Sequence, residues 1–141
     1  VDGQSGELFI LQARPETVQS RADHSVARSW QVVGERGDEL ARGLAIGTAA
    51  ACGEAHVLDG PEQIAAFPDG GVLVASSTDP DWLPAMRRAS AIVTEHGGRT
   101  SHAAIVSREL GLPAVIGAPD ATTSLAENAM VTVDCTQGDI G

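Results

Sequence analysis

The sequence predicts an α/β domain in which helices cover one side of a mixed β-sheet and a second β layer covers the other. Strand-like and helix-like segments alternate between residues 71 and 134, whereas the segment from residue 43 to 58 is mainly β-like. Such an order is typical of layered α/β folds. Hydrophobic residues make up 43% of the 141-residue chain, which is sufficient for a buried core.

The expected strands are runs of alternating or continuous apolar residues bounded by Gly or Pro. They cover residues 8–13, 30–34, 71–76, 90–94, 113–117 and 129–134, and two more between residues 43 and 58 are joined by a turn around Cys52 and Gly53. Residues 16–27 are polar and lack a clear period, so they are interpreted as a linker, with a weak helix as the alternative.

The expected helices begin and end at residues with known preferences for those positions. They cover residues 61–67, 81–89, 101–110 and 121–127. Pro61 suits the first turn of a helix, and Asp81 suits the N-cap of the next one. Gly111 is expected to end the helix that starts at Ser101 or His102.

The composition restricts both the core and the partners. The chain has two Phe, two Trp and no Tyr, so the core must consist mainly of Val, Ile, Leu and Ala. The net charge is −10, and the nine basic residues are scattered along the chain. Binding to a nucleic-acid backbone requires clustered cations. The sequence therefore argues against nucleic acid as a partner.

Neither a disulfide nor a metal site is expected in this chain. Cys52 and Cys135 lie far apart without the spacing of metal ligands, and reduced thiols suggest a cytoplasmic protein. Asp120, Asp134 and Asp139 do not form a metal-binding pattern. No apolar run is long enough to cross a membrane, and no signal peptide is apparent. We expect the chain to be a piece of a longer polypeptide.

The loop between the strand at residues 90–94 and the following helix carries the chemistry. Gly97 and Gly98 allow backbone conformations that direct amides at an anion. The first amides of a helix have no internal partners, and the helix end carries partial positive charge, so the loop and helix together can bind an anion. Thr100 and Ser101 add hydroxyl groups that can cap the helix or bind phosphoryl oxygens.

His102 lies in the first turn of this helix and is the candidate nucleophile. The positive helix end disfavours imidazolium, and a neutral imidazole is a nucleophile. Arg99 could screen a negative charge on the ring. The glycines are not a Walker A loop, because no Gly-Lys-Thr or Gly-Lys-Ser follows them. The pattern alone leaves an alternative open, in which the loop is an ordinary corner of an α/β protein.

The other polar side chains are expected to play smaller parts. His96 is interpreted as a solvated loop residue, and Arg108 is expected to form a structural ion pair. His24 and His56 are expected to have no partner.

Residues 97–117 have the sequence GGRTSHAAIVSRELGLPAVIG, which resembles the phosphohistidine signature of the phosphoenolpyruvate-utilising enzymes. These include phosphoenolpyruvate synthase, pyruvate phosphate dikinase and enzyme I of the sugar phosphotransferase system. The resemblance implies that His102 is phosphorylated on Nε2. It also implies that the loop residues stabilise the phosphoryl group; these are Gly97, Gly98, Arg99, Thr100 and Ser101.

The resemblance also implies a three-layer β/β/α swivelling domain. Such a domain moves between an ATP-grasp domain, where the histidine is phosphorylated, and a TIM barrel of the same polypeptide, where pyruvate accepts the phosphoryl group. Residues 78–94 resemble the phosphoenolpyruvate synthase branch in particular. Ser101 departs from it, because synthases often have Cys before the histidine, whereas the dikinase and enzyme I have Ser.

Residues 6–17 resemble the closing strand of the ATP-grasp domain, where Gln12 and Arg14 would contact nucleotide phosphates or metal-bound oxygens. The resemblance therefore divides the chain into three parts. Residues 1–19 are the C-terminal strand of the ATP-grasp domain, residues 20–36 are a hinge linker, and residues 37–141 are the phosphohistidine domain.

By this resemblance the intact enzyme converts ATP, pyruvate and water into phosphoenolpyruvate, AMP and phosphate with Mg²⁺, whereas this chain alone binds neither ATP nor Mg²⁺. Thr100 resembles the threonine modified by a regulatory kinase/phosphorylase, although it would serve equally well as an N-cap. Two groups of alternatives stay open. One is the swivelling domain of the dikinase, of a glucan or antibiotic phosphotransferase, or of enzyme I. The other is a non-catalytic interaction domain of the same fold.

Overall fold

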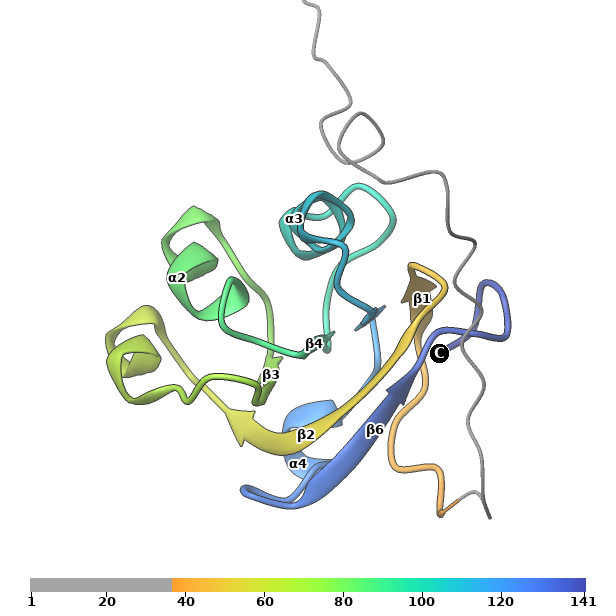
Figure 1. Ribbon diagram of the computed structural model, residues 1–141, viewed down its shortest axis with the longest axis horizontal. Helices are drawn as coiled ribbons and strands as arrows, with labels where there is room; N and C mark the ends of the chain where they lie inside the picture. Colours follow the sequence, from red (N-terminus) through yellow and green to blue (C-terminus); the bar gives the residue numbers. More distant parts are fainter. Residues whose placement is uncertain (1–36) are drawn as a thin grey trace, which may run out of the picture.

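A six-stranded sheet with helices packed against it forms the described part of the chain, residues 37–141 of the computed structural model (Figure 1). The elements follow one another as β1 (Leu44–Ile46), β2 (Ala50–Val57), the 3-10 helix η1 (Pro61–Ala66), β3 (Val72–Ala75), the 3-10 helix η2 (Pro80–Trp82), α2 (Leu83–Met86), β4 (Ala91–Thr94), α3 (His102–Leu110), β5 (Ala114–Ile116), α4 (Ala121–Ser124) and β6 (Met130–Asp134). The predictions for residues 1–36, which include the two earliest strands, the linker, Gln12 and Arg14, lie outside the described residues.

The strand order β1-β5-β4-β3-β2-β6 combines a parallel centre with antiparallel edges. Strands β2, β3, β4 and β5 run parallel, while β1 pairs antiparallel with β5 and β6 pairs antiparallel with β2. The first part of β2, Ala50–Glu54, pairs with β6, and its last part, Ala55–Val57, pairs with β3. The long strand β2 therefore curls the sheet, as Figure 1 shows. Because the central strands are parallel, the carboxyl ends of β3, β4 and β5 lie at one edge.

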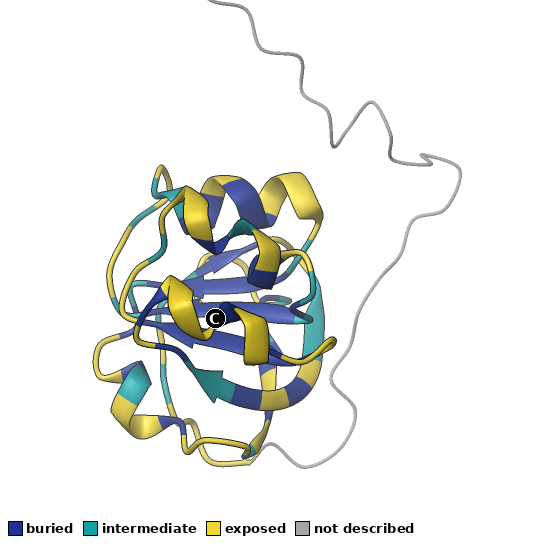
Figure 2. Ribbon diagram, turned by 90° about the vertical axis from the view of Figure 1, so that its left-hand side faces the viewer, coloured by how far each residue is buried: buried dark blue, intermediate teal, exposed yellow. Residues whose placement is uncertain are grey.

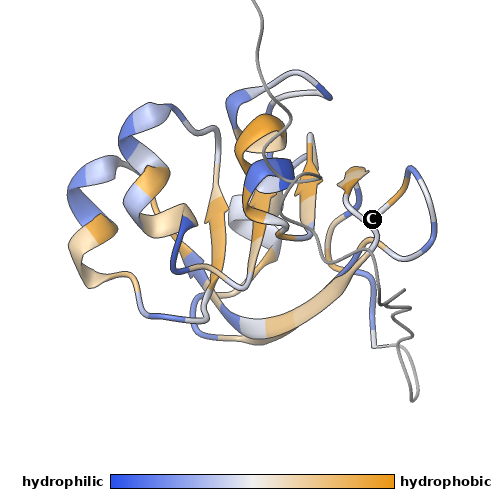
Figure 3. Ribbon diagram, turned by 45° about the horizontal axis from the view of Figure 1, so that its top comes forward, coloured by the Kyte–Doolittle hydropathy of each residue, from blue (hydrophilic) through white to orange (hydrophobic). Residues whose placement is uncertain are grey.

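Two apolar clusters lie on opposite faces of the sheet, and the sheet strands are buried between them (Figure 2). The first cluster joins the sheet to η1, α2 and α3, and it contains both Phe67 and Trp82. The second contains α4 and the inner side of β6, and consists of Ala, Val, Leu and one buried Cys. Apolar positions therefore gather along the strands and the inner sides of the helices, while the helices carry polar residues outside (Figure 3). The predicted α/β class and the small-residue core are confirmed, and the second β layer comes from the curl of the same sheet.

The turn expected at Cys52 and Gly53 was wrong. The chain turns between β1 and β2, where Gly47 has a φ of +89°, and both residues lie inside β2 opposite β6. Gly53 is required there by packing, because a Cβ would lie 2.6 Å from the carbonyl oxygen of Gly70. A glycine in a strand therefore marked a close backbone contact in this case, and not a turn.

Helix boundaries also differ from the prediction. Asp79, and not Asp81, caps the segment after β3, because its carboxylate accepts a hydrogen bond from the backbone N–H of Asp81 at 2.9 Å. Pro80 then occupies the first helical position, as prolines prefer. The expected helix at 81–89 is reduced to η2 and the short α2, and α4 ends at Ser124 instead of residue 127. The 61–66 segment is a 3-10 helix with Pro61 in its first turn, as predicted.

Candidate functional site

The loop that carries His102 leaves the sheet at the carboxyl end of β4 (Figure 1). Pairing with β3 continues past the strand, since the backbone N–H groups of Glu95 and His96 donate to the carbonyls of Ala75 and Ser76 at 3.2 and 2.9 Å. The hydroxyl of the buried Thr94 donates to the carbonyl of His96 at 3.0 Å. The first part of the loop is therefore held rigidly to the sheet.

Gly97 is the position at which the loop requires glycine. Its φ is +125°, which side chains rarely allow, and an added Cβ would lie 2.9 Å from Cβ and Oγ of Ser101 and 3.0 Å from Cγ2 of Ile116. Gly98 differs, because its φ is outside the left-handed region and no atom lies within 4 Å of an added Cβ. The expectation that both glycines permit special backbone conformations therefore holds for Gly97 and is wrong for Gly98.

Ser101 is the N-cap of α3. Its backbone is extended, its Oγ accepts a hydrogen bond from the N–H of Ala104 at 3.4 Å, and its carbonyl accepts one from the N–H of Ile105 at 3.0 Å. Thr100 is exposed and does not cap the helix, so the N-cap alternative for Thr100 was wrong. Gly111 ends α3 in the left-handed conformation with a φ of +70°, as predicted.

His102 is the first residue of α3 and is partly buried. Its Nε2 is buried and has no hydrogen-bond partner among the described residues. Among the described residues, Nε2 of His56 and the hydroxyl oxygen of Thr78 are also buried without a hydrogen-bond partner, so the place of His102 at the start of α3 is what points to a functional role. Because Nε2 is turned away from solvent in this conformer, the ring must rotate before that atom can react with an incoming group.

Arg99 and Arg108 both contact residues that the sequence did not indicate. The guanidinium of Arg99 forms an ion pair with Asp139, with 2.9 Å between Nη2 and Oδ1. Arg108 forms no ion pair with any residue between 37 and 141, and instead its Nη1 donates to the carbonyls of Arg99 at 2.8 Å and Ala104 at 3.4 Å. The backbone of the loop is therefore fastened to α3 by the side chain of Arg108.

Sequence reasoning missed a brace between the loop and α4. The Glu95 carboxylate accepts hydrogen bonds from the backbone N–H of Thr122, at 3.0 Å, and from its hydroxyl group. The hydrogen bond from the Thr122 hydroxyl has the larger effect and the one from its backbone N–H the smaller, and both lower the pKa of the Glu95 carboxyl below its usual range. His96, expected to be merely solvated, has its Nδ1 3.1 Å from the hydroxyl oxygen of Ser76. Both contacts join residues more than fifteen positions apart, which no local pattern reveals.

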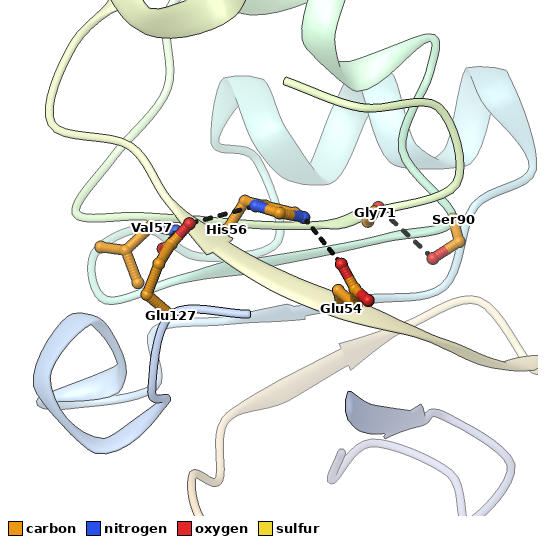
Figure 4. Close-up of polar contacts among 6 residues, drawn as sticks. All are labelled: Glu54, His56, Val57, Gly71, Ser90 and Glu127. Carbon is orange, nitrogen blue, oxygen red and sulfur yellow. Dashed lines mark hydrogen bonds and ion pairs between the residues drawn. The ribbon is translucent and has the colours of Figure 1, made fainter. Parts of the chain in front are cut away.

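His56 was expected to have no partner, and this was wrong. Its Nδ1 lies 3.1 Å from Oε1 of Glu127, and the other oxygen of that carboxylate, Oε2, accepts a hydrogen bond from the N–H of Val57 at 2.7 Å. The Nε2 of His56 lies 3.9 Å from a carboxylate oxygen of Glu54 (Figure 4). This cluster fastens β2 to the segment before β6. None of these contacts involves His102, so the cluster belongs to the scaffold.

Within residues 37–141, no three or more His, Cys, Asp or Glu residues gather in a way that could hold a metal ion. In the same range, no helix has the length and apolar character needed to cross a bilayer.

Comparison with known proteins decides the family. The family model described as "PEP-utilising enzyme, mobile domain" matches residues 67–138, about half of the chain, and this range includes the whole His102 loop and α3. The chain belongs to this family of mobile domains. The resemblance of residues 97–117 to the phosphohistidine signature is thereby confirmed at the level of the family.

Relatives of this mobile domain are larger proteins. A phosphoenolpyruvate synthase of Deinococcus radiodurans is 51% identical over 140 residues, and one of Synechocystis is 48% identical over 140 residues. Each alignment covers 99% of this chain but only 18% and 17% of those relatives. A solution structure of Enzyme I is 30% identical with a TM-score of 0.47, covering 55% of this chain and 32% of that one.

Proposed function

We propose that this mobile domain carries a phosphoryl group on His102 within an enzyme of the phosphoenolpyruvate synthase type. The position of His102 supports this most strongly. The residue begins α3 directly after the loop that contains Gly97, and its Nε2 forms no hydrogen bond with residues 37–141. The names of the relatives support the synthase over the dikinase, enzyme I and other phosphotransferases.

In the first step the ring of His102 turns outward and the Nε2 lone pair attacks a phosphorus atom of the nucleotide. Because AMP and phosphate are the products, the phosphorus attacked is the β-phosphorus: its bond to the bridging oxygen of AMP breaks, and AMP leaves with the electron pair. Water then attacks the terminal phosphorus, so that phosphate leaves and one phosphoryl group stays on Nε2. The proton of the ring stays on Nδ1. In the second step the enolate oxygen of pyruvate attacks the phosphorus, and the P–N bond electrons return to Nε2. Phosphoenolpyruvate forms and the neutral imidazole is regenerated.

The loop is proposed to stabilise the phosphoryl group on His102. The free amides at the start of α3 and the partial positive charge of the helix end each favour the anion, by about 0.3–1 kcal/mol per favourable charge. The residues assigned to this role are Gly97, Gly98, Arg99, Thr100 and Ser101. A regulatory phosphate on Thr100 would compete for the same amides and repel the incoming group, so Thr100 is also the candidate for control by a kinase/phosphorylase.

The rest of the reaction is assigned to other parts of the polypeptide. Residues 1–19 are assigned to an ATP-grasp domain, with Gln12 and Arg14 at the nucleotide phosphates, and residues 20–36 to the hinge. Mg²⁺ is assigned, together with ATP, to the ATP-grasp domain. There it neutralises phosphate charge. A TIM barrel supplies pyruvate. The intact enzyme then converts ATP, pyruvate and water into phosphoenolpyruvate, AMP and phosphate in the cytoplasm.

The test uses the full-length protein incubated with phosphoenolpyruvate alone, which runs the second step in reverse. Intact-mass spectrometry should show one acid-labile phosphoryl group, and peptide mapping should place it on His102. The His102→Ala variant should gain none, while His56→Ala, which changes a histidine of the scaffold, should gain one. Loss of the phosphoryl group in His56→Ala but not in His102→Ala would refute the proposal.

A second measurement distinguishes the synthase from the dikinase. When turnover with ATP and pyruvate takes place in ¹⁸O-labelled water, the released phosphate should carry one labelled oxygen in a synthase, because water is the second phosphoryl acceptor. Incorporation of inorganic phosphate into pyrophosphate would instead identify a dikinase and leave the role of His102 unchanged.

A further inference from the structure

Arg99 connects the His102 loop to the last described residues of the chain. Its guanidinium pairs with Asp139 at 2.9 Å, and the two side chains are 56% and 76% exposed. Asp139 belongs to a short segment beside β1, where its carbonyl accepts a hydrogen bond from the N–H of Ala45 at 3.0 Å. Ile140 then forms an antiparallel bridge with Leu44. The ion pair therefore spans from the candidate site to the edge of the sheet.

The side chain of Arg99 can move without moving the loop. Its carbonyl accepts a hydrogen bond from Arg108 at 2.8 Å, which fastens the backbone to α3. The Asp139 carboxylate is the only side-chain partner of the guanidinium among residues 37–141. Arg99 also lies three residues before His102, on the other side of the N-cap.

A phosphoryl group on His102 would be a stronger partner than Asp139 for this arginine. An exposed ion pair contributes little to stability. A phosphoryl group carries more charge than a carboxylate and offers three acceptor oxygens, and arginine binds such oxygens with two parallel hydrogen bonds. The free amides at the start of α3 hold the group at the same end of the helix.

We propose that Asp139 holds Arg99 while His102 is unphosphorylated and releases it to the phosphoryl group when His102 is phosphorylated. The charge state of His102 is thereby transmitted to residues 139–141, which lose one of their attachments to the loop. This regulation of the site rests on the proposed function. Asp139 is a positioning residue in this scheme, because it acts on the phosphoryl group only through Arg99.

The test uses the 141-residue chain phosphorylated with phosphoramidate, a chemical phosphoryl donor, after mass spectrometry has located the group on His102. NMR of the arginine side chains should show the Arg99 guanidinium signal shifting on phosphorylation. Amide exchange at Ala45 and Gly141 should become faster, because the segment beside β1 loses the ion pair. An unchanged Arg99 signal and unchanged exchange in phosphorylated molecules would overturn the proposal.

Variants give the energetic readout. Asp139→Asn should raise the equilibrium constant for phosphorylation of His102 by about two- to five-fold, the range that loss of an exposed ion pair allows. Arg99→Gln should lower it, and adding Asp139→Asn to Arg99→Gln should have no further effect. Asp69→Asn is the matched control, because Asp69 pairs with Arg88 at 4.0 Å and precedes β3. It therefore lies near the amino ends of the parallel strands, whereas the His102 loop follows the carboxyl end of β4. An equal effect of Asp69→Asn would also overturn the proposal.

The two proposals fail separately. If full-length protein is not phosphorylated on His102 by phosphoenolpyruvate, the carrier function fails. If His102 carries the group and Arg99 keeps its bond to Asp139, the carrier function stands and the coupling fails.

Discussion

Replacement of Gly97 by alanine should damage the loop, whereas the same change at Gly98 should not. The two glycines are neighbours in the same loop, so the pair of variants separates the effect of backbone geometry from that of composition. Gly97 has a φ of +125° and an added Cβ would lie 2.9 Å from Ser101 and 3.0 Å from Ile116. Gly98 has neither a positive φ nor a neighbour within 4 Å of an added Cβ.

The expected magnitude for Gly97→Ala follows from two costs. A residue held in a disfavoured positive-φ region costs about 1–3 kcal/mol. Overpacking against Ser101 and Ile116 costs about 1–3 kcal/mol more. Since the exposed loop can relax in part, we expect a loss of about 2–4 kcal/mol in the free energy of unfolding. Gly98→Ala should change the free energy of unfolding by less than about 1 kcal/mol, and the change can be stabilising.

Urea unfolding of the two variants and the unchanged chain measures these values from the midpoint and slope. Phosphorylation of His102 in full-length protein gives the functional readout. We expect Gly97→Ala to slow it more than Gly98→Ala does, because a displaced loop would no longer direct its amides at the phosphoryl group. Equal losses of stability in both variants, or none in Gly97→Ala, would show that the positive φ of Gly97 is not required for the structure of the loop.

Three further measurements test the surrounding contacts. Ser101→Ala should lower the free energy of unfolding by about 0.5–1 kcal/mol through loss of the N-cap, while Thr100→Ala should stay within about 0.5 kcal/mol; equal effects in urea unfolding would contradict the assignment of the cap. Because the folded pKa of Glu95 is lowered, its contribution is present at neutral pH and lost as the pH falls through that pKa, so Glu95→Gln should flatten the acid side of the stability–pH curve; an unchanged curve would argue against the brace to α4. Burial raises the pKa of the Cys135 thiol, whereas Cys52 is exposed, so a thiol reagent should modify Cys52 first, and faster labelling of Cys135 in folded protein would contradict its burial.

The helix and strands around the site were largely predictable from the sequence. The strands at 71–76 and 90–94 and the helix at 102–110 with its Gly111 stop follow from signals within a few residues of each other. Such signals are local, since the apolar period and the cap residues lie in the same segment that they specify. The local pattern also made His102 a candidate nucleophile, but only the resemblance of residues 97–117 to a known signature favoured that role over an ordinary corner of an α/β protein.

The tertiary structure decided everything that depends on residues brought together from distant segments. The requirement for glycine at Gly53 comes from the carbonyl of Gly70, so a strand position looked like a turn. Likewise, the partner of Arg99 is forty residues away at Asp139. A linear sequence specifies which groups are available. Only the folded chain determines which of them meet, because their contact depends on the packing of whole strands and helices against one another.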